Sequence, residues 1–178
     1  MTEWIINVDR RVANKVVKIH NKILNKIMIA FTYSGVAAII WFVTLAIPFL
    51  FIKSYRDVGL CMIIALGVNY ILSEILLKHL VRRKRPSTFV DDDKMLINKP
   101  KDPSFPSGHA SSSFAATAVV FLLCPWYIFV PALIVASIIG FSRIYLQVHY
   151  LSDVIAGAIF GSMVGFSIVA LFFKFFGV

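Results

Sequence analysis

Residues 110–142 read ASSSFAATAVVFLLCPWYIFVPALIVASIIGFS, a run of 33 residues without a charged side chain. At a rise of 1.5 Å per residue, one helix of this length would extend about 50 Å, whereas the hydrocarbon core of a bilayer is roughly 30 Å thick. The sequence CPWY at 124–127 divides the run, because proline disfavours helix at the residue before it and aromatic side chains favour the membrane interface. The stretch therefore predicts two membrane helices, over 109–124 and 127–143, joined by a tight turn.

Apolar segments on both sides of this hairpin predict three more membrane helices, over 27–52, 58–80 and 152–174. The chain of 178 residues is 59% hydrophobic and only 15% charged, so it lacks the polar surface of a soluble domain. We expect an all-α integral-membrane bundle of about five transmembrane helices, forming a single domain over 1–178.

The N-terminal segment 1–26 has the pattern of an amphipathic helix. Apolar residues recur at steps of three and four, with a basic stripe beside them that follows the same rhythm. This pattern predicts a helix that lies in the headgroup layer with its apolar face toward the lipid.

The net charge of +9 would suggest a nucleic-acid partner in a soluble protein. Here the basic residues gather in segments that flank apolar spans, which favours a bilayer and a lipid phosphate as partners, and no nucleic acid. The one long polar connection, 81–105, is the expected active-site loop. Its acidic run, Asp91 to Asp93, is interpreted as solvated surface in preference to a cation site.

Three ionisable clusters lie near the ends of predicted spans, where burial is costly without a partner. The first is Lys78 with Arg85-Pro86, the second is Pro106-Ser107-Gly108-His109, and the third is Ser142-Arg143 with His149 and Asp153. The hairpin at 124–127 returns the third cluster to the membrane face that holds the other two.

These residue types suit cleavage of a phosphate ester. Three cations, Lys78, Arg85 and Arg143, can neutralise the phosphoryl oxygens, and Ser107 and Gly108 at a helix start can add donors. We expect His149 to be the nucleophile, oriented by a hydrogen bond to Asp153 one helical turn away, and His109 to be the general acid and base. Taken singly, each residue has a structural alternative: a helix-end pair for His149 and Asp153, snorkelling for Lys78, interface anchoring for the arginines.

Together the clusters read KxxxxxxRP, PSGH and SRxxxxxHxxxD, and the chain resembles the type 2 phosphatidic acid phosphatase (PAP2) superfamily over roughly residues 20–173. The resemblance implies a metal-independent phosphatase without cofactor, with a core related to vanadium haloperoxidases and with the same roles for the two histidines. In length and N-terminal pattern the chain is most similar to small bacterial members of the undecaprenyl-diphosphatase type. The favoured substrate is thus undecaprenyl pyrophosphate, with phosphatidylglycerophosphate or phosphatidate as alternatives.

Two other classes of function remain open at this point: an anion transporter and a non-catalytic lipid-binding membrane protein. The transporter would need polar side chains at mid-depth in its spans, and most predicted spans are apolar there. A multi-pass protein of the bacterial plasma membrane is expected. The distribution of Lys and Arg favours a cytoplasmic site by the positive-inside rule, whereas the resemblance implies an extracytoplasmic one, which we adopt.

Overall fold

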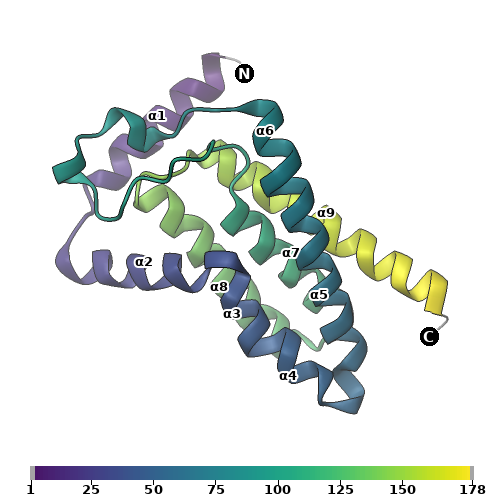
Figure 1. Ribbon diagram of the computed structural model, residues 1–178. Coiled ribbons are helices and arrows are strands. Elements are labelled where there is room, and N and C mark those ends of the chain that lie inside the picture. The colour runs from purple at the N-terminus through teal and green to yellow at the C-terminus, as the bar shows by residue number, and fades with distance from the viewer. Residues whose placement is uncertain (1–2, 177–178) are drawn as a thin grey trace.

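The computed structural model describes residues 3–176, apart from the side chain of Ala37. Residues 1, 2, 177 and 178, which the predicted domain and N-terminal helix include, lie outside this description. The described chain is mainly helical and contains no strand, which confirms the predicted fold class (Figure 1). Its α-helices are α1 (Glu3–Val17), α2 (Lys22–Ser34), α3 (Ile39–Trp41), α4 (Ile47–Leu50), α5 (Arg56–Tyr70), α6 (Lys78–Val81), α7 (Gly108–Leu123), α8 (Trp126–Tyr145) and α9 (Leu151–Phe176).

Three helices of the described chain are long and apolar enough to cross a membrane: Lys53–Val81, α8 and α9. The first of these is continuous because a π-helical stretch, Ile71–Leu77, joins α5 to α6. The segments predicted over 109–124, 127–143 and 152–174 correspond to α7, α8 and α9, although α7 is a shorter apolar helix of 16 residues. The number of spans is therefore only approximately five.

The span predicted over 27–52 corresponds to two helical segments rather than to one continuous helix. The chain forms α2 there and then, after a break, the helical segment Ile39–Leu50, and the two meet at 69°. The break contains Gly35, and Ala38 has a positive φ of 57°, which an α-helix does not allow. Any Cβ at Gly35 would lie 2.9 Å from Cδ2 of His109, so a glycine lets the end of α2 approach α7 closely.

The helix predicted over 1–26 is interrupted between α1 and α2. Helix α1 ends at Val17, and α2 begins after Asn21, whose side chain accepts hydrogen bonds from the amides of Ile23 (3.1 Å) and Leu24 (2.9 Å). The apolar side chains Val12 and Val16 of α1 pack against protein rather than lipid, in a cluster around the end of α8 and the start of α9.

The central helix α7 is packed most closely against α9 (Figure 1). Gly157, Gly161 and Gly165 form a stripe on α9, and a Cβ at these positions would lie 2.6 Å, 1.9 Å and 2.5 Å from backbone carbonyl oxygens of residues 107, 111 and 115. The stripe lets the two backbones touch, as small residues do in membrane helix pairs. It thereby fixes the N-terminus of α7, which carries the PSGH sequence.

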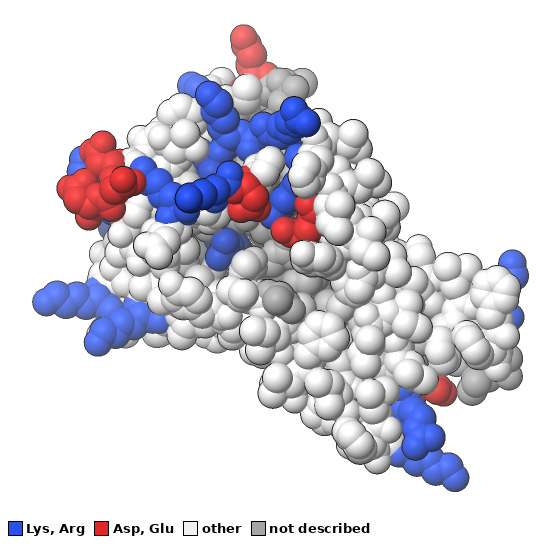
Figure 2. Space-filling view, in the orientation of Figure 1, with Lys and Arg blue, Asp and Glu red and all other residues white. Residues whose placement is uncertain are grey.

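The charged residues are concentrated at one end of the molecule. Figure 2 shows acidic and basic side chains gathered around α1, α6 and the connection between α6 and α7, while a broad uncharged surface covers α3, α4 and α5 except for charged side chains at the turn between α4 and α5. Large hydrophobic side chains such as Phe51 and Ile71 are exposed on this uncharged part, as expected for a lipid-facing surface.

Candidate active site

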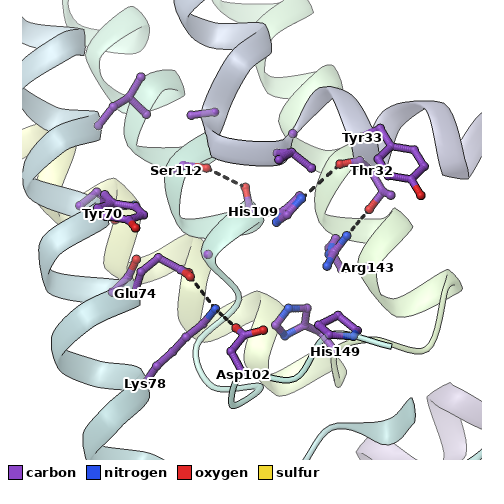
Figure 3. A pocket seen from close by; sticks show the side chains of 18 of the residues that line it. Thr32, Tyr33, Tyr70, Glu74, Lys78, Asp102, His109, Ser112, Arg143 and His149 are labelled. Atoms are coloured by element: carbon purple, nitrogen blue, oxygen red, sulfur yellow. Dashed lines mark hydrogen bonds and ion pairs between the residues drawn. The ribbon is translucent and has the colours of Figure 1, made fainter. Parts of the chain in front are cut away.

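A cavity of about 720 Å³ lies between α2, the π-helical stretch, α7 and the connection between α6 and α7 (Figure 3). Six of the eight predicted site residues line it: Lys78, Arg85, Gly108, His109, Arg143 and His149. The other two, Ser107 and Asp153, are fully buried and are not among the lining residues. Three stretches that are far apart in the sequence thus meet at one cavity.

Each stretch delivers its residues from the end of a helix. Lys78 follows the π-helical stretch, Gly108 and His109 open α7, and Arg143 lies in the last turn of α8. His149 lies in the short connection after α8, where its amide and that of Val148 both donate to the carbonyl of Arg143 at 3.1 Å. These bonds hold His149 close to the backbone of α8.

His149 is buried, and Nε2 of its imidazole lies 2.9 Å from Nη1 of Arg85. A guanidinium can only donate, so Nε2 is the unprotonated nitrogen and Nδ1 carries the hydrogen. Burial, followed by the positive charges of Arg85, Arg143 and Lys78, holds the pKa of His149 well below its usual range. The imidazole is therefore neutral at neutral pH, with a lone pair on Nε2.

The predicted hydrogen bond between His149 and Asp153 is not formed. Nδ1 of His149 lies 3.6 Å from Oδ2 of Asp153, which is too long for a hydrogen bond, and this Nδ1 is buried without a partner within the described chain. The same Oδ2 accepts from the amide of Tyr150 at 2.9 Å. The two side chains are adjacent, and the distance between Nδ1 and Oδ2 exceeds that of a hydrogen bond by a few tenths of an ångström.

His109 is held by the end of α2. Its Nε2 lies 3.1 Å from the backbone carbonyl oxygen of Thr32, and because a carbonyl only accepts, this nitrogen carries a hydrogen. Nδ1 is then the nitrogen that can exchange a proton with a ligand. The bend after α2 thus helps to orient the second histidine.

Two of the three predicted phosphate-binding cations are paired with a carboxylate that is not among the residues predicted from the sequence. Lys78 donates to Glu74 at 2.7 Å and to Asp102 at 2.5 Å (Figure 3). Arg85 donates to the same Oδ2 of Asp102 at 2.8 Å. Burial opposes ionisation of Asp102, but the hydrogen bond and charge of Lys78 and the charge of Arg85 prevail and lower its pKa to about 2. The only sequence signal for Asp102 is its place just before the PSGH sequence.

The third cation, Arg143, is more available to an anionic ligand than Lys78 and Arg85 are. It is 6% exposed, its Nη1 donates to the hydroxyl of Thr32, and its Nε is buried without a partner among the residues described. A buried, unpaired guanidinium N–H is costly and is well placed for an anionic ligand.

The backbone amide of Ser107 is engaged within the protein and is not free to bind a phosphate. This amide donates to the backbone carbonyl of Asp153 at 3.0 Å, which ties the start of α7 to the start of α9. The Ser107 hydroxyl is buried without a partner in the part of the chain that the structure describes.

Arg83 differs from its neighbours Arg82 and Lys84 in its surroundings. Arg82 and Lys84 are exposed, but Arg83 is largely buried and forms ion pairs with Asp9 and Asp153. Its partners lie 74 and 70 residues away along the chain. Such partners cannot be recognised from local sequence.

The acidic run Asp91 to Asp93 is exposed, and two of its carboxylates pair with lysines, Asp91 with Lys94 and Asp92 with Lys99, both at 2.6 Å. Within residues 3–176 no group of three or more His, Cys, Asp or Glu side chains is arranged to hold a metal ion.

The cavity combines two chemical environments. Its charged end holds the two histidines with Lys78, Arg85 and Arg143, and its other walls include apolar side chains such as Val36, Phe42 and Leu66. This combination suits a ligand with an anionic head and an apolar tail. The fold and the cavity therefore define a class of protein: a helical membrane protein whose cavity suits a phosphorylated amphiphile.

Comparison with known proteins gives the family. The model of the PAP2 superfamily matches residues 56–176, and the chain belongs to that superfamily. It is thus a membrane lipid phosphatase.

Individual relatives agree with this assignment. The chain is 32% identical to an undecaprenyl-diphosphatase of Sulfolobus acidocaldarius over 143 residues, covering 80% of this chain and 68% of the relative. It is 27% identical to phosphatidylglycerophosphatase B of Bacillus subtilis, covering 93% of this chain and 83% of that protein. The crystal structure of a transmembrane PAP2-type phosphatidylglycerolphosphate phosphatase from Bacillus subtilis superposes with a TM-score of 0.80 at 25% identity, covering 97% of this chain and 88% of the other.

Proposed function

We propose that this protein removes the terminal phosphate of a polyprenyl pyrophosphate through a phosphohistidine on His149, without a metal ion. The proposal rests on one observation. His109 and His149 belong to different sequence motifs, and both line one cavity together with Lys78, Arg85 and Arg143. The favoured reaction converts undecaprenyl pyrophosphate to undecaprenyl phosphate.

In the first step, the lone pair on Nε2 of His149 attacks phosphorus and forms a P–N bond, while the P–O bond to the leaving group breaks. His109 gives a proton to the departing oxygen, and the cations neutralise the charge on the phosphoryl oxygens. In the second step, His109 accepts a proton from water, the water oxygen bonds to phosphorus, and the P–N bond breaks. Inorganic phosphate leaves, and His149 returns to its neutral form.

Asp153 supports the first step. As Nε2 bonds to phosphorus, the imidazole gains positive charge, and a carboxylate beside Nδ1–H stabilises it. The separation of 3.6 Å between Nδ1 and Oδ2 needs to shorten only slightly for a hydrogen bond.

The preference for a polyprenyl substrate rests on the Sulfolobus relative, an undecaprenyl-diphosphatase at 32% identity. A second candidate is phosphatidylglycerophosphate, which the Bacillus relative and structure support by their names. Both lipids would place a terminal phosphate among the cations and a chain along the apolar wall. We further propose that the protein resides in the plasma membrane with the cavity opening on the extracytoplasmic side.

The test is phosphate release from undecaprenyl pyrophosphate, phosphatidylglycerophosphate and phosphatidate, in detergent with and without EDTA. The parent protein should hydrolyse the pyrophosphate fastest and be insensitive to EDTA, while His149→Ala should lose at least about 1,000-fold in kcat, as loss of a nucleophile does. Acid-labile phosphate bound to the parent and absent from His149→Ala would mark the intermediate. Parent-like hydrolysis by His149→Ala would refute the nucleophile, and loss of activity in EDTA would refute the metal-independent route.

A further inference from the structure

We infer that Arg83, held by Asp9 of α1, is a positioning residue that fixes the carboxylate of Asp153 behind the nucleophile. This inference rests on the proposed role of His149. It assigns a function to the N-terminal helix, which would otherwise be a peripheral element.

The contacts form a closed network. Arg83 donates through Nη1 to Oδ1 of Asp153 and to the Ser152 hydroxyl (2.7 Å), and through Nη2 to Oδ2 of Asp9 (2.7 Å). Asp9 also accepts from the Ser152 amide (2.9 Å) and hydroxyl (2.6 Å). The network thus joins α1, the connection after α6, and the first turn of α9.

These groups are withdrawn from solvent. The side chains of Asp9 and Asp153 are 2% and 0% exposed, and that of Arg83 is 12% exposed. Charges this deeply buried are strongly destabilising when a partner is missing, unlike exposed ion pairs. The guanidinium also lies 4.0 Å from the centroid of the Tyr150 ring, which fixes its plane.

The geometry divides the two oxygens of Asp153 between two tasks. Arg83 occupies Oδ1, so Oδ2 is the oxygen that faces Nδ1 of His149. Because one cation lies between two carboxylates, the network of Asp9, Arg83 and Asp153 retains one negative charge, beside the imidazole that becomes positive during attack.

Arg83 and Arg85 contact different members of the His149–Asp153 pair. They are two residues apart in a non-helical stretch, and Arg85 is extended, with φ −76° and ψ 154°. Arg85 binds Nε2 of His149 from the cavity, and Arg83 reaches the histidine's other side through Asp153. The two arginines therefore bracket the His149–Asp153 pair.

The test compares Arg83→Gln, Asp9→Asn and the double variant in phosphate-release assays on the full-length protein. Arg83→Gln should lower kcat about 10- to 100-fold, the usual range for a residue that orients a reactive group, with KM within about 2-fold. Asp9→Asn should lower kcat about 3- to 10-fold at unchanged KM. If Asp9 acts through Arg83, the kcat of the double variant should equal that of Arg83→Gln within about 2-fold.

Rescue and controls separate positioning from folding. Arg83→Lys should have a kcat between those of Arg83→Gln and the parent, because lysine keeps the positive charge but lacks the planar guanidinium that donates to two carboxylates at once. Lys84 and Arg10 are the exposed neighbours of Arg83 and Asp9, and the variants Lys84→Gln and Arg10→Gln should keep the kcat and KM of the parent protein. If Arg83→Gln does not fold, Arg83→Lys and Asp9→Asn decide the question, and both must lower kcat at constant KM.

Parent-like kcat in the folded Arg83 and Asp9 variants, or losses that multiply in the double variant, would overturn the inference. So would losses expressed only in KM or in the yield of folded protein. These outcomes are distinct from failure of the proposed function, which would show as activity retained by His149→Ala.

Discussion

Asp102 holds two of the cations that we propose to bind the substrate phosphate. Its Oδ2 bridges Nζ of Lys78 and Nη2 of Arg85, at 2.5 Å and 2.8 Å. A phosphate entering the cavity must compete with this carboxylate for both donors, because each N–H can serve only one strong acceptor well. On the proposed function, we therefore expect phosphate binding to exchange one anion for another rather than to fill an empty site.

Removing this competitor should strengthen anion binding. Asp102→Asn should lower the inhibition constants of orthovanadate and inorganic phosphate by about 3- to 10-fold, since a charge-assisted hydrogen bond is replaced by a weaker neutral one. Inhibition of phosphate release measures both constants. Asp93→Asn, an exposed carboxylate of the same connection, is the matched control and should leave them unchanged.

Weaker vanadate inhibition in Asp102→Asn would mean that Asp102 organises the cations for the ligand instead of competing with it. The pKa of about 2 for Asp102 makes the variant a clean comparison, because the parent carboxylate is ionised throughout the neutral range.

At the level of helices, the glycine stripe of α9 decides where the active-site end of α7 lies. A Cβ at Gly161 would lie 1.9 Å from the carbonyl oxygen of Ser111, far inside van der Waals contact, so the helices must separate to admit a methyl group. Gly108 and His109 begin the same helix and would move with it.

Gly161→Ala should therefore destabilise the protein by about 1 to 3 kcal/mol, the usual cost of overpacking, and lower its Tm in detergent. Gly67→Ala on α5 is the control: its Cβ would meet nothing within 4 Å, and the higher helix propensity of alanine should leave the Tm unchanged or raise it. Thermal unfolding followed by circular dichroism measures both. A parent-like Tm for Gly161→Ala would show that α7 and α9 separate without cost.

For the whole molecule, the main question is which side of the membrane the cavity faces. The charged end carries α1, α6 and the connection that contains Asp102, and the opposite end of the helix Lys53–Val81 lies about 40 Å away by helical rise. The positive charge of the cavity end favours the cytoplasm by the positive-inside rule. Several of its cations, however, are engaged within the protein: Lys78 and Arg85 with Asp102, and Arg83 with Asp9 and Asp153.

We expect the cavity end to face outward. In a background with Cys61 and Cys124 replaced by alanine, Asp93→Cys should react with a membrane-impermeant maleimide on intact cells. Ser54→Cys, exposed at the opposite end, should react only after permeabilisation. If Ser54→Cys reacted on intact cells and Asp93→Cys only after permeabilisation, the cavity would open on the cytoplasmic side.

The sequence by itself determined the membrane class, the helical hairpin at 124–127 and the residues that meet in the cavity. These features are encoded locally: apolar runs set helix length, and the three motifs each hold their residues within a dozen positions. Six of the eight predicted residues line the cavity because each motif lies at a helix end on the same side of the bundle.

The tertiary structure alone decided how these residues are paired. The bend after α2, the carboxylate of Asp102 between Lys78 and Arg85, and the link from Asp9 through Arg83 to Asp153 all depend on side chains from separate elements. Asp9 and Ser152, for example, are 143 residues apart in sequence and yet hydrogen-bonded. A buried charge takes whichever partner the packed helices bring near, and the sequence around it does not specify that partner.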